Sequence, residues 1–451
     1  MIVKMIFGKK KKLKKQYNSL REAKNYSRFC NAPFTSIRFH RNGGMQFCCH
    51  HIDYQFIQKK SVKNIWFSEY YEEFRKKMIK YDIPESCQFC GIPYFNEDYY
   101  NVNALSFDYL EPNKNGYPVL LDFSLENTCN LACIMCDTSL SSKLQAQKNF
   151  KPKSKDFSYD VNFLEQLVEF FPFVKHTIFT GGEPFLVNIY YEIWDKMFEI
   201  NPDIIINITT NGTIYNKKIQ NLLEKSKVNI TVSMDSFNTD TYEKIRVGAI
   251  FDEAWNNVQQ FSEQCKKKNR IFTITICPMI INAFEIPDIV NKCNSEQWNF
   301  NFNIVLKPWQ QAIWSLSVEK IQEIIDYFRT YEFNENSEIA KSNIFRFQNL
   351  ISLLEFWRLR LVEMRKNIKN DIEILELRGQ IVNLIFQILG EVNEDLSRKV
   401  KEVIFKIPEL LIDEKLLKHV EKMPKSMIIN EFQDNDVDTI VDHLCIVAFN
   451  L

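Results

Sequence analysis

Six short apolar runs between residues 119 and 302 constrain the fold of this chain more than any other feature of its sequence. Stretches with helical periodicity separate them, for example 163–170 and 254–265. Alternating strands and helices predict a parallel sheet, because a crossover helix usually connects parallel neighbours. The runs begin near Val119, Thr177, Ile204, Val228, Phe272 and Phe300. The expected fold class is therefore α/β, with functional loops at the carboxyl ends of the strands.

The loop after the first run carries three cysteines, Cys129, Cys133 and Cys136, spaced Cys-x3-Cys-x2-Cys. Iron–sulfur clusters usually take four thiolates, so three at this spacing can hold a cube of iron and sulfur and leave one iron open. A small chelating molecule can complete the coordination, as S-adenosylmethionine does through its amino and carboxylate groups. A zinc site is the alternative, although no fourth ligand lies at the usual zinc spacing.

Further motifs follow this loop in order. The second run leads into Gly181-Gly182-Glu183-Pro184, the third ends at Asn211-Gly212, and the fourth contains Ser233-Met234-Asp235. Together with the cysteine loop, they resemble the radical S-adenosylmethionine (radical SAM) superfamily. The resemblance implies a partial (β/α)6 barrel, similar to a TIM barrel, with Asn211, Asp235, Cys277 and Lys307 near the cysteine loop at one mouth.

The resemblance also implies roles for single residues. Cys129, Cys133 and Cys136 would be the catalytic cysteines that hold a 4Fe-4S cluster, Met135 would pack on the adenine, and Arg246 would bind the carboxylate of the cofactor. A guanidinium fork fits a carboxylate in a way that an ammonium cannot. The implied contacts to S-adenosylmethionine are Met135, Gly181, Gly182, Glu183, Asn211, Ser233, Asp235 and Arg246. Taken singly, these could be a turn, a strand end and a surface charge.

Eight of the twelve cysteines precede residue 137. Four of them, Cys30, Cys48, Cys87 and Cys90, form a Cys-x12-Gly-x4-Cys pattern with a distant Cys-x2-Cys. The pattern resembles the twitch domain, a shortened relative of the SPASM domain, which usually follows the barrel rather than preceding it. The resemblance implies an auxiliary 4Fe-4S cluster with these four cysteines as metal ligands. A structural zinc held by the same thiolates stays the alternative.

Local signals favour convergence of these four cysteines. Asn42-Gly43-Gly44 predicts a hairpin between the first two, because its residues tolerate positive φ. Ser68 is expected to cap a helix that ends near Pro84 and leads to the last two. Cys49, beside Cys48, is a spare thiol that we expect to be a buried bystander.

Composition limits the partners and the compartment. Lys plus Arg and Asp plus Glu number 57 each, so the net charge gives no global attraction to nucleic acid or to a membrane. The chain has no uninterrupted apolar segment of about 18 residues, so no membrane span is expected. Twelve cysteines at cluster-like spacings, without secretory features, indicate a reducing compartment, and we expect a cytoplasmic protein.

The organisation along the chain follows from these patterns. From Val318 onward the periodicity is helical and Gly and Pro become rare. We expect a basic leader at 1–28, a twitch-like auxiliary Fe–S domain at 29–117, the radical SAM partial barrel at 118–312, and an all-α domain at 313–451.

The first functional hypothesis is an oxidoreductase. The resemblance implies that the chain cleaves S-adenosylmethionine reductively to a 5'-deoxyadenosyl radical, which abstracts hydrogen from an unactivated C–H bond. The auxiliary cluster would move electrons during oxidation of a peptide or a small sugar-like molecule. An electron donor such as flavodoxin or ferredoxin is the expected partner.

Two other hypotheses stay open. A redox-neutral rearrangement, cyclisation or epimerisation needs the barrel but no oxidation. Cys277, at the end of the fifth run, could then donate hydrogen, although a buried structural cysteine is the plainer interpretation. The third hypothesis is an Fe–S cluster sensing or binding protein that docks a partner through its helical domain.

Overall fold

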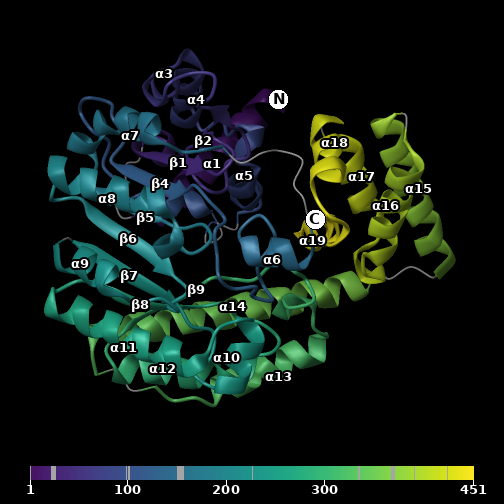
Figure 1. Ribbon diagram of the computed structural model, residues 1–451. Coiled ribbons are helices and arrows are strands. Elements are labelled where there is room, and N and C mark those ends of the chain that lie inside the picture. Colours follow the sequence, from purple (N-terminus) through teal and green to yellow (C-terminus); the bar gives the residue numbers. More distant parts are fainter. Residues whose placement is uncertain are drawn as a thin grey trace.

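The computed structural model describes residues 2–21, 27–97, 99, 102–149, 157–225, 227–333, 336–366, 371–390, 392–423 and 425–450. The chain forms one mixed sheet flanked by helices, and a group of helices near the carboxyl end lies beside it (Figure 1). The strand order is β3-β2-β1-β4-β5-β6-β7-β8-β9. This arrangement confirms the predicted α/β class with a helical carboxyl-terminal region.

The six predicted runs are six neighbouring strands that reach one edge of the sheet, and each pairs in parallel with the next. They are β4 (Leu120–Ser124), β5 (His176–Phe179), β6 (Ile205–Thr210), β7 (Val228–Ser233), β8 (Phe272–Ile276) and β9 (Asn299–Phe302). The intervening helices are α6 (Ser142–Gln147), α7 (Val161–Val168), α8 (Asn188–Ile200), α9 (Lys217–Lys225), α10 (Thr239–Ile245), α11 (Phe251–Lys267) and α12 (Ile286–Ser295). All carboxyl ends therefore meet at one edge of the sheet.

The two faces of the sheet differ in chemistry. On the outer face, Phe123 and Phe179 stack with ring centroids 4.8 Å apart, and Trp194 of α8 packs on Phe179. The inner face, by the alternation of strand residues, is mostly polar and partly exposed. It includes Arg38, Asp122, Asn207, Thr209, Asn229, Thr231, Ser233, Thr273, Thr275 and Asn301. A filled barrel carries bulky branched side chains there, whereas most of these side chains are polar.

The amino-terminal strands extend the same sheet. β1 (Ser36–His40) and β2 (Gly44–Gln46) form the predicted hairpin, with Gly43 at a φ of +79° in its turn. β3 (Gln55–Phe56) continues it, whereas the other edge of β1 pairs in parallel with β4. The helices here are α1 (Ile2–Ser19), α2 (Ala32–Thr35), α3 (Val62–Trp66), α4 (Glu69–Ile79) and α5 (Gln88–Phe95). The twitch-like segment thus shares backbone pairing with the barrel, and its boundaries stay a prediction.

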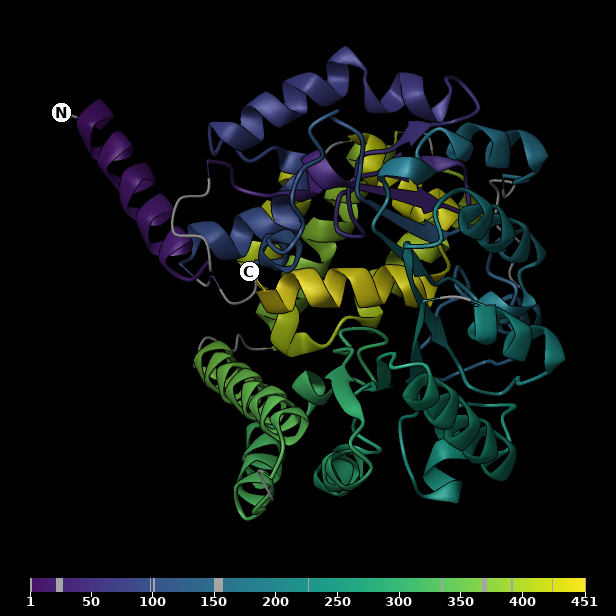
Figure 2. The same ribbon diagram turned by 90° about the vertical axis from the view of Figure 1, so that its left-hand side faces the viewer.

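Two of these amino-terminal helices bear on the cysteine positions. The predicted cap is present, since Ser68 Oγ accepts from the amide of Tyr71 at the start of α4. The second half of α1 is anchored through Tyr17, whose ring stacks on Phe29 with centroids 5.3 Å apart, while its first residues extend away (Figure 2). The amide of Phe29 also donates to the Met78 carbonyl of α4 at 3.0 Å, so both helices hold the residue before Cys30.

The carboxyl-terminal helices begin by closing the last strand edge. Asn343 of α14 is fully buried, accepts from the Phe300 amide at 2.9 Å and donates to the Trp298 carbonyl at 2.9 Å. The helices are α13 (Val318–Arg329), α14 (Glu338–Arg365), α15 (Asp371–Leu389), α16 (Glu394–Lys406), α17 (Glu414–Lys422), α18 (Lys425–Asp434) and α19 (Val437–Asn450). In the part of the chain described, no helix combines the length and apolar character needed to cross a membrane.

Candidate functional site

The three-cysteine loop (residues 129–136) leaves the carboxyl end of β4. The amide of Ala132 donates to the Val247 carbonyl at 2.9 Å, and that of Ile134 donates to the Ile245 carbonyl at 3.0 Å. Ser141 adds a hydroxyl that donates to the Leu131 carbonyl at 2.6 Å. These bonds lay the loop along residues 245–247, and so they fix the backbone that carries the thiols.

The thiols of Cys129, Cys133 and Cys136 lie close enough to influence one another. Burial is the largest cause of their raised pKa values; Cys129 also raises the pKa of Cys133, and both raise that of Cys136. A cation at this position would reverse that effect, because a coordinated thiol is deprotonated outright. The donor set therefore fits a positively charged iron centre held by three thiolates.

The two glycines of the second motif lie against this loop. Gly181 has a φ of +80°, and a Cβ there would come within 2.9 Å of the Glu126 carbonyl oxygen. Gly182 has a φ of +49°, and its Cβ would lie 2.2 Å from the Thr128 carbonyl oxygen. The two glycines thus let the backbone of residues 126–128 approach closely, and their predicted contact with the cofactor stays a prediction.

Glu183 is fully buried, and both of its carboxylate oxygens are engaged within the protein. They accept from the Phe185 amide at 3.2 Å, the Thr210 hydroxyl at 2.8 Å and the Asn211 amide at 2.7 Å. Burial raises the pKa of Glu183 to about 7, against the opposing effect of these hydrogen bonds. In this structure Glu183 ties the end of β6 to the glycine motif.

Asn211 reaches the three-cysteine loop directly. Its Nδ2 donates to Asn130 Oδ1 at 2.9 Å and lies 4.0 Å from the Sγ of Cys129. Its Oδ1 accepts from the amide of Thr213 at 2.9 Å. Asn211 thus orients the residue beside the first cysteine.

Asp235 and Arg246, two predicted cofactor contacts, form a buried ion pair at 2.7 Å. Asp235 Oδ1 also accepts from the Cys277 amide at 2.7 Å, and Arg246 Nη1 lies 4.0 Å from Cys133 Sγ. Burial opposes the charge on Arg246, but Asp235 and Cys133 outweigh it and raise the pKa of the guanidinium. The pair therefore sets a positive group beside the middle cysteine.

The other predicted residues also lie at the carboxyl edge. Ser233 ends β7 on the inner face, Met135 is half-buried in the three-cysteine loop, and Cys277 is buried at the end of β8, as expected. Lys307 donates to Asp137 at 3.1 Å and lies 3.1 Å from His443 Nε2, so α19 contributes to the mouth. The structure thus brings the predicted mouth residues together.

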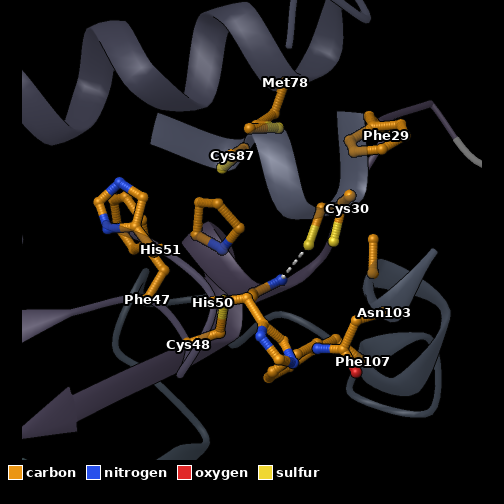
Figure 3. A pocket seen from close by; sticks show the side chains of 14 residues that line it. Phe29, Cys30, Phe47, Cys48, His50, His51, Met78, Cys87, Asn103 and Phe107 are labelled. Carbon is orange, nitrogen blue, oxygen red and sulfur yellow. Dashed lines mark hydrogen bonds between the residues drawn. The ribbon is translucent and has the colours of Figure 1, made fainter. Parts of the chain in front are cut away.

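The four amino-terminal cysteines line a single hollow of about 400 Å³, part of it open to solvent. Figure 3 shows Cys30, Cys48 and Cys87 around this space, and Cys90 also lines it. Burial is the first cause of the raised pKa of each thiol, to about 12 for Cys48 and about 11 for Cys90. Four convergent thiols in one hollow fit a fully ligated cluster.

Cys49 departs from our expectation, because its side chain is exposed rather than buried. The charges of Arg38 and Asp122 act on its thiol. Cys48 lines the four-cysteine hollow, and Cys49, in the turn after β2, lies near the Arg38–Asp122 pair.

No three His, Cys, Asp or Glu side chains among the described residues lie close enough together to hold a single metal ion.

Sequence reasoning missed Arg38 and Asp122, which form an ion pair between neighbouring strands. The available signal was a charged residue inside each short, otherwise apolar strand. It also missed His443, for which we find no signal in the helical segment.

Comparison with protein families matches two parts of the chain. A model of the radical SAM superfamily matches residues 124–293, and a model of the SPASM iron–sulfur cluster-binding domain matches residues 30–91. The SPASM match precedes the radical SAM match, in the order expected from the cysteines. Both groups of predicted cluster ligands lie inside these two segments.

Among curated relatives, the GTP 3',8-cyclase of Listeria welshimeri is 28% identical over 184 residues, which is 40% of this chain and 51% of the relative. The GTP 3',8-cyclase of Aquifex aeolicus is 26% identical over 174 residues, 38% of this chain and 51% of the relative. The chain thus spans about half the length of these relatives.

Two solved structures are similar to this chain. One is anSMEcpe with bound AdoMet, at a TM-score of 0.36 and 19% identity, with 47% of this chain and 59% of that chain covered. The other is Streptococcus suis SuiB bound to S-adenosylmethionine, at a TM-score of 0.36 and 15% identity, with 62% of this chain and 64% of that chain covered.

Proposed function

This chain is a radical SAM iron–sulfur enzyme with a SPASM domain, and we propose that it catalyses a redox-neutral rearrangement or cyclisation of a small polar molecule. The family implies a 4Fe-4S cluster with S-adenosylmethionine and an auxiliary cluster. The observation that carries the proposal is the inner face of the sheet, whose side chains are polar and partly exposed. A molecule seated there would lie beside the three-cysteine loop.

The similar curated proteins support the same outcome. Their name, GTP 3',8-cyclase, describes a ring closure within one molecule. The similarity covers about 40% of this chain, so the substrate is part of the proposal. GTP is the first compound to test, and the polar inner face suits a nucleotide better than an apolar side chain of a peptide.

The residues of this chain prepare the site for that chemistry. The cluster and S-adenosylmethionine, when bound, supply the electron and the carbon radical that start hydrogen abstraction. Cys129, Cys133 and Cys136 would hold the cluster, and the Asp235–Arg246 pair places a cation beside Cys133. Gly181 and Gly182 let the backbone of residues 126–128, just before Cys129, approach the glycine motif closely.

Oxidation of the substrate is the second candidate, because the auxiliary hollow supplies four thiols. A cluster with four cysteine ligands has no open iron for a substrate, so electron transfer is the task that fits it. A peptide or a sugar-like molecule would then lose two electrons overall. The two candidates differ in the fate of the substrate radical, which loses a second electron in the oxidation and regains one in the redox-neutral reaction.

The oxidation state of the product separates the two candidates. The reconstituted protein, kept without oxygen and reduced with dithionite, would be incubated with S-adenosylmethionine and GTP. We expect 5'-deoxyadenosine to accumulate faster with GTP and the product to have the oxidation state of the substrate. A product two electrons more oxidised would replace our proposal by the second candidate. No 5'-deoxyadenosine with or without GTP would overturn both.

A further inference from the structure

One ion pair on the inner face has no assigned role. Arg38 lies on β1 and Asp122 lies on β4, and the two are direct partners in the parallel register of these strands. Phe39 and Phe123, their neighbours, stack on the opposite face with centroids 5.4 Å apart. Both members of the ion pair therefore lie on the inner face of the sheet, opposite the stacked phenylalanines.

The pair leaves hydrogen-bonding capacity unused. Arg38 reaches Asp122 through Nη1 alone, and the second carboxylate oxygen, Oδ1, is buried without a hydrogen-bond partner. A guanidinium carries five N–H donors in a fixed fork. The side chains of Arg38 and Asp122 keep 16% and 13% of their surface exposed, so a small molecule can reach them.

A second arginine of the same region shows what a purely structural pair looks like. Arg21 binds Asp108 with two nitrogens, one to each carboxylate oxygen, and its side chain is fully buried. That geometry uses both oxygens of the acid. The Arg38–Asp122 pair is partly exposed and uses one, which is the arrangement expected of groups that bind a further molecule.

The surroundings place this pair between the two cysteine sites. Cys49 is exposed beside Arg38, and the ring of His50 stacks on Phe89 with centroids 3.7 Å apart. Cys48, the preceding residue, lines the four-cysteine hollow. A molecule held by Arg38 would therefore lie next to the auxiliary site, while its other end extends along the inner face of the sheet.

We propose that Arg38 and Asp122 form an anion subsite for the substrate. The free donors of Arg38 bind an oxyanion, either a phosphate or a carboxylate, and Oδ1 of Asp122 accepts from a neighbouring hydroxyl or amine of the same molecule. This inference rests on the proposed function, because it assumes that the substrate occupies the inner face. It adds the chemical class of the substrate and a residue from the SPASM-matched segment.

Equilibrium binding to the reconstituted enzyme, without reductant, tests the subsite. The probes are tripolyphosphate and GTP for the phosphate arm, tricarballylate for the carboxylate arm, and guanosine as the uncharged reference. We expect the enzyme to bind the anion of one arm. Arg38→Met should weaken that binding at least about tenfold. Arg38→Lys should have an intermediate affinity, because lysine keeps the charge but lacks the guanidinium fork. Asp122→Asn should strengthen binding of the bare oxyanion, because a negative charge is removed.

Matched measurements locate the binding and check the fold. Lys63→Met removes a surface ion pair with Glu169 and should bind the anion like the unaltered enzyme. Alkylation of Cys49 by iodoacetamide, followed by mass spectrometry, should slow when the anion is bound. Iron content and the thermal midpoint identify a variant that fails to fold. If the Arg38 variants fail to fold, the anion affinity of Asp122→Asn is the measurement that tests the subsite.

Two outcomes overturn the subsite. One is the absence of binding in both arms, and the other is an affinity that changes in neither the Arg38 variants nor Asp122→Asn. Since these measurements use no reductant, they fail independently of the assay for 5'-deoxyadenosine. A reaction that proceeds with unchanged anion affinity in the Arg38 variants would keep the proposed function and reject the subsite.

Discussion

The four-cysteine hollow and the three-cysteine loop differ in how much of a cluster's coordination the chain supplies. The hollow gathers its thiols from separate segments around a hairpin and a short helix. The loop carries all of its thiols within eight residues and is held by backbone bonds to residues 245–247. Three ligands leave one iron for a small molecule, and four leave none. Chemistry on S-adenosylmethionine is therefore expected at the loop.

The largest effect should come from removing one thiol of the loop. Cys133→Ala leaves two ligands, and we expect cleavage of S-adenosylmethionine to fall to background. The measurement is 5'-deoxyadenosine formed under strong reductant without oxygen. Cys265→Ala is the matched control, because Cys265 is buried in α11, away from both cysteine sites. Turnover that survives in Cys133→Ala would falsify the assignment of the loop.

Removing one thiol of the hollow should have a smaller effect on the cleavage of S-adenosylmethionine. Cys87→Ala is expected to lose the auxiliary cluster, about half of the roughly eight irons of two 4Fe-4S clusters. Cleavage of S-adenosylmethionine should continue, while product formation falls. Iron analysis and electron paramagnetic resonance measure the loss. Cys49→Ala should keep its iron, and the same loss in both variants would contradict our ligand set.

The ion pair beside the loop should contribute to stability. Arg246→Leu leaves Asp235 charged and buried, and breaking such a pair costs about 3–5 kcal/mol. Urea unfolding of the protein without cofactors measures the change. The double variant Arg246→Leu with Asp235→Leu should recover part of it, because no buried charge remains. Equal destabilisation in the single and double variants would show that the charge pairing is unimportant.

Glu183 should make stability depend on pH. Burial raises its pKa from 4.5 to about 7, so its favourable contribution is complete below pH 4.5. Above that value the unfolded chain ionises first, and the contribution is lost as the pH rises to about 7. At about 1.4 kcal/mol per pKa unit, the loss approaches about 3 kcal/mol.

Urea unfolding of the cofactor-free protein at pH 5 and pH 8 tests this dependence. The variant Glu183→Gln cannot ionise, so we expect it to lose less stability between these two pH values than the unaltered protein. Glu165→Gln, on the surface of α7, is a control for changing a carboxylate. The same pH response in all three proteins would show that Glu183 ionises normally.

Much of the barrel could be predicted because its signals are local. The six apolar runs mark β4 to β9 to within two residues, and Ser68 marks the start of α4 through a hydrogen bond three residues away. The cysteine spacings likewise lie within short segments, which a sequence displays directly. These signals need no knowledge of which strand lies beside which.

Other features depend on partners distant in sequence. β1 pairs with β4 across some eighty residues, so the Arg38–Asp122 pair exists only once that register is known. Asp235 and Arg246 were expected to contact the cofactor separately, and they bind each other in the structure. Residue type and spacing predict which groups reach the mouth. They do not predict which of those groups neutralise one another.

The shared edge between β1 and β4 means that this protein is not modular in the way its two family matches suggest. A fragment beginning at residue 118 would leave unpaired the edge of β4, five residues long, that now pairs with β1. Unpaired strand edges of that kind recruit other chains. Swapping the amino-terminal segment between relatives would therefore require transplanting the strand together with its neighbour.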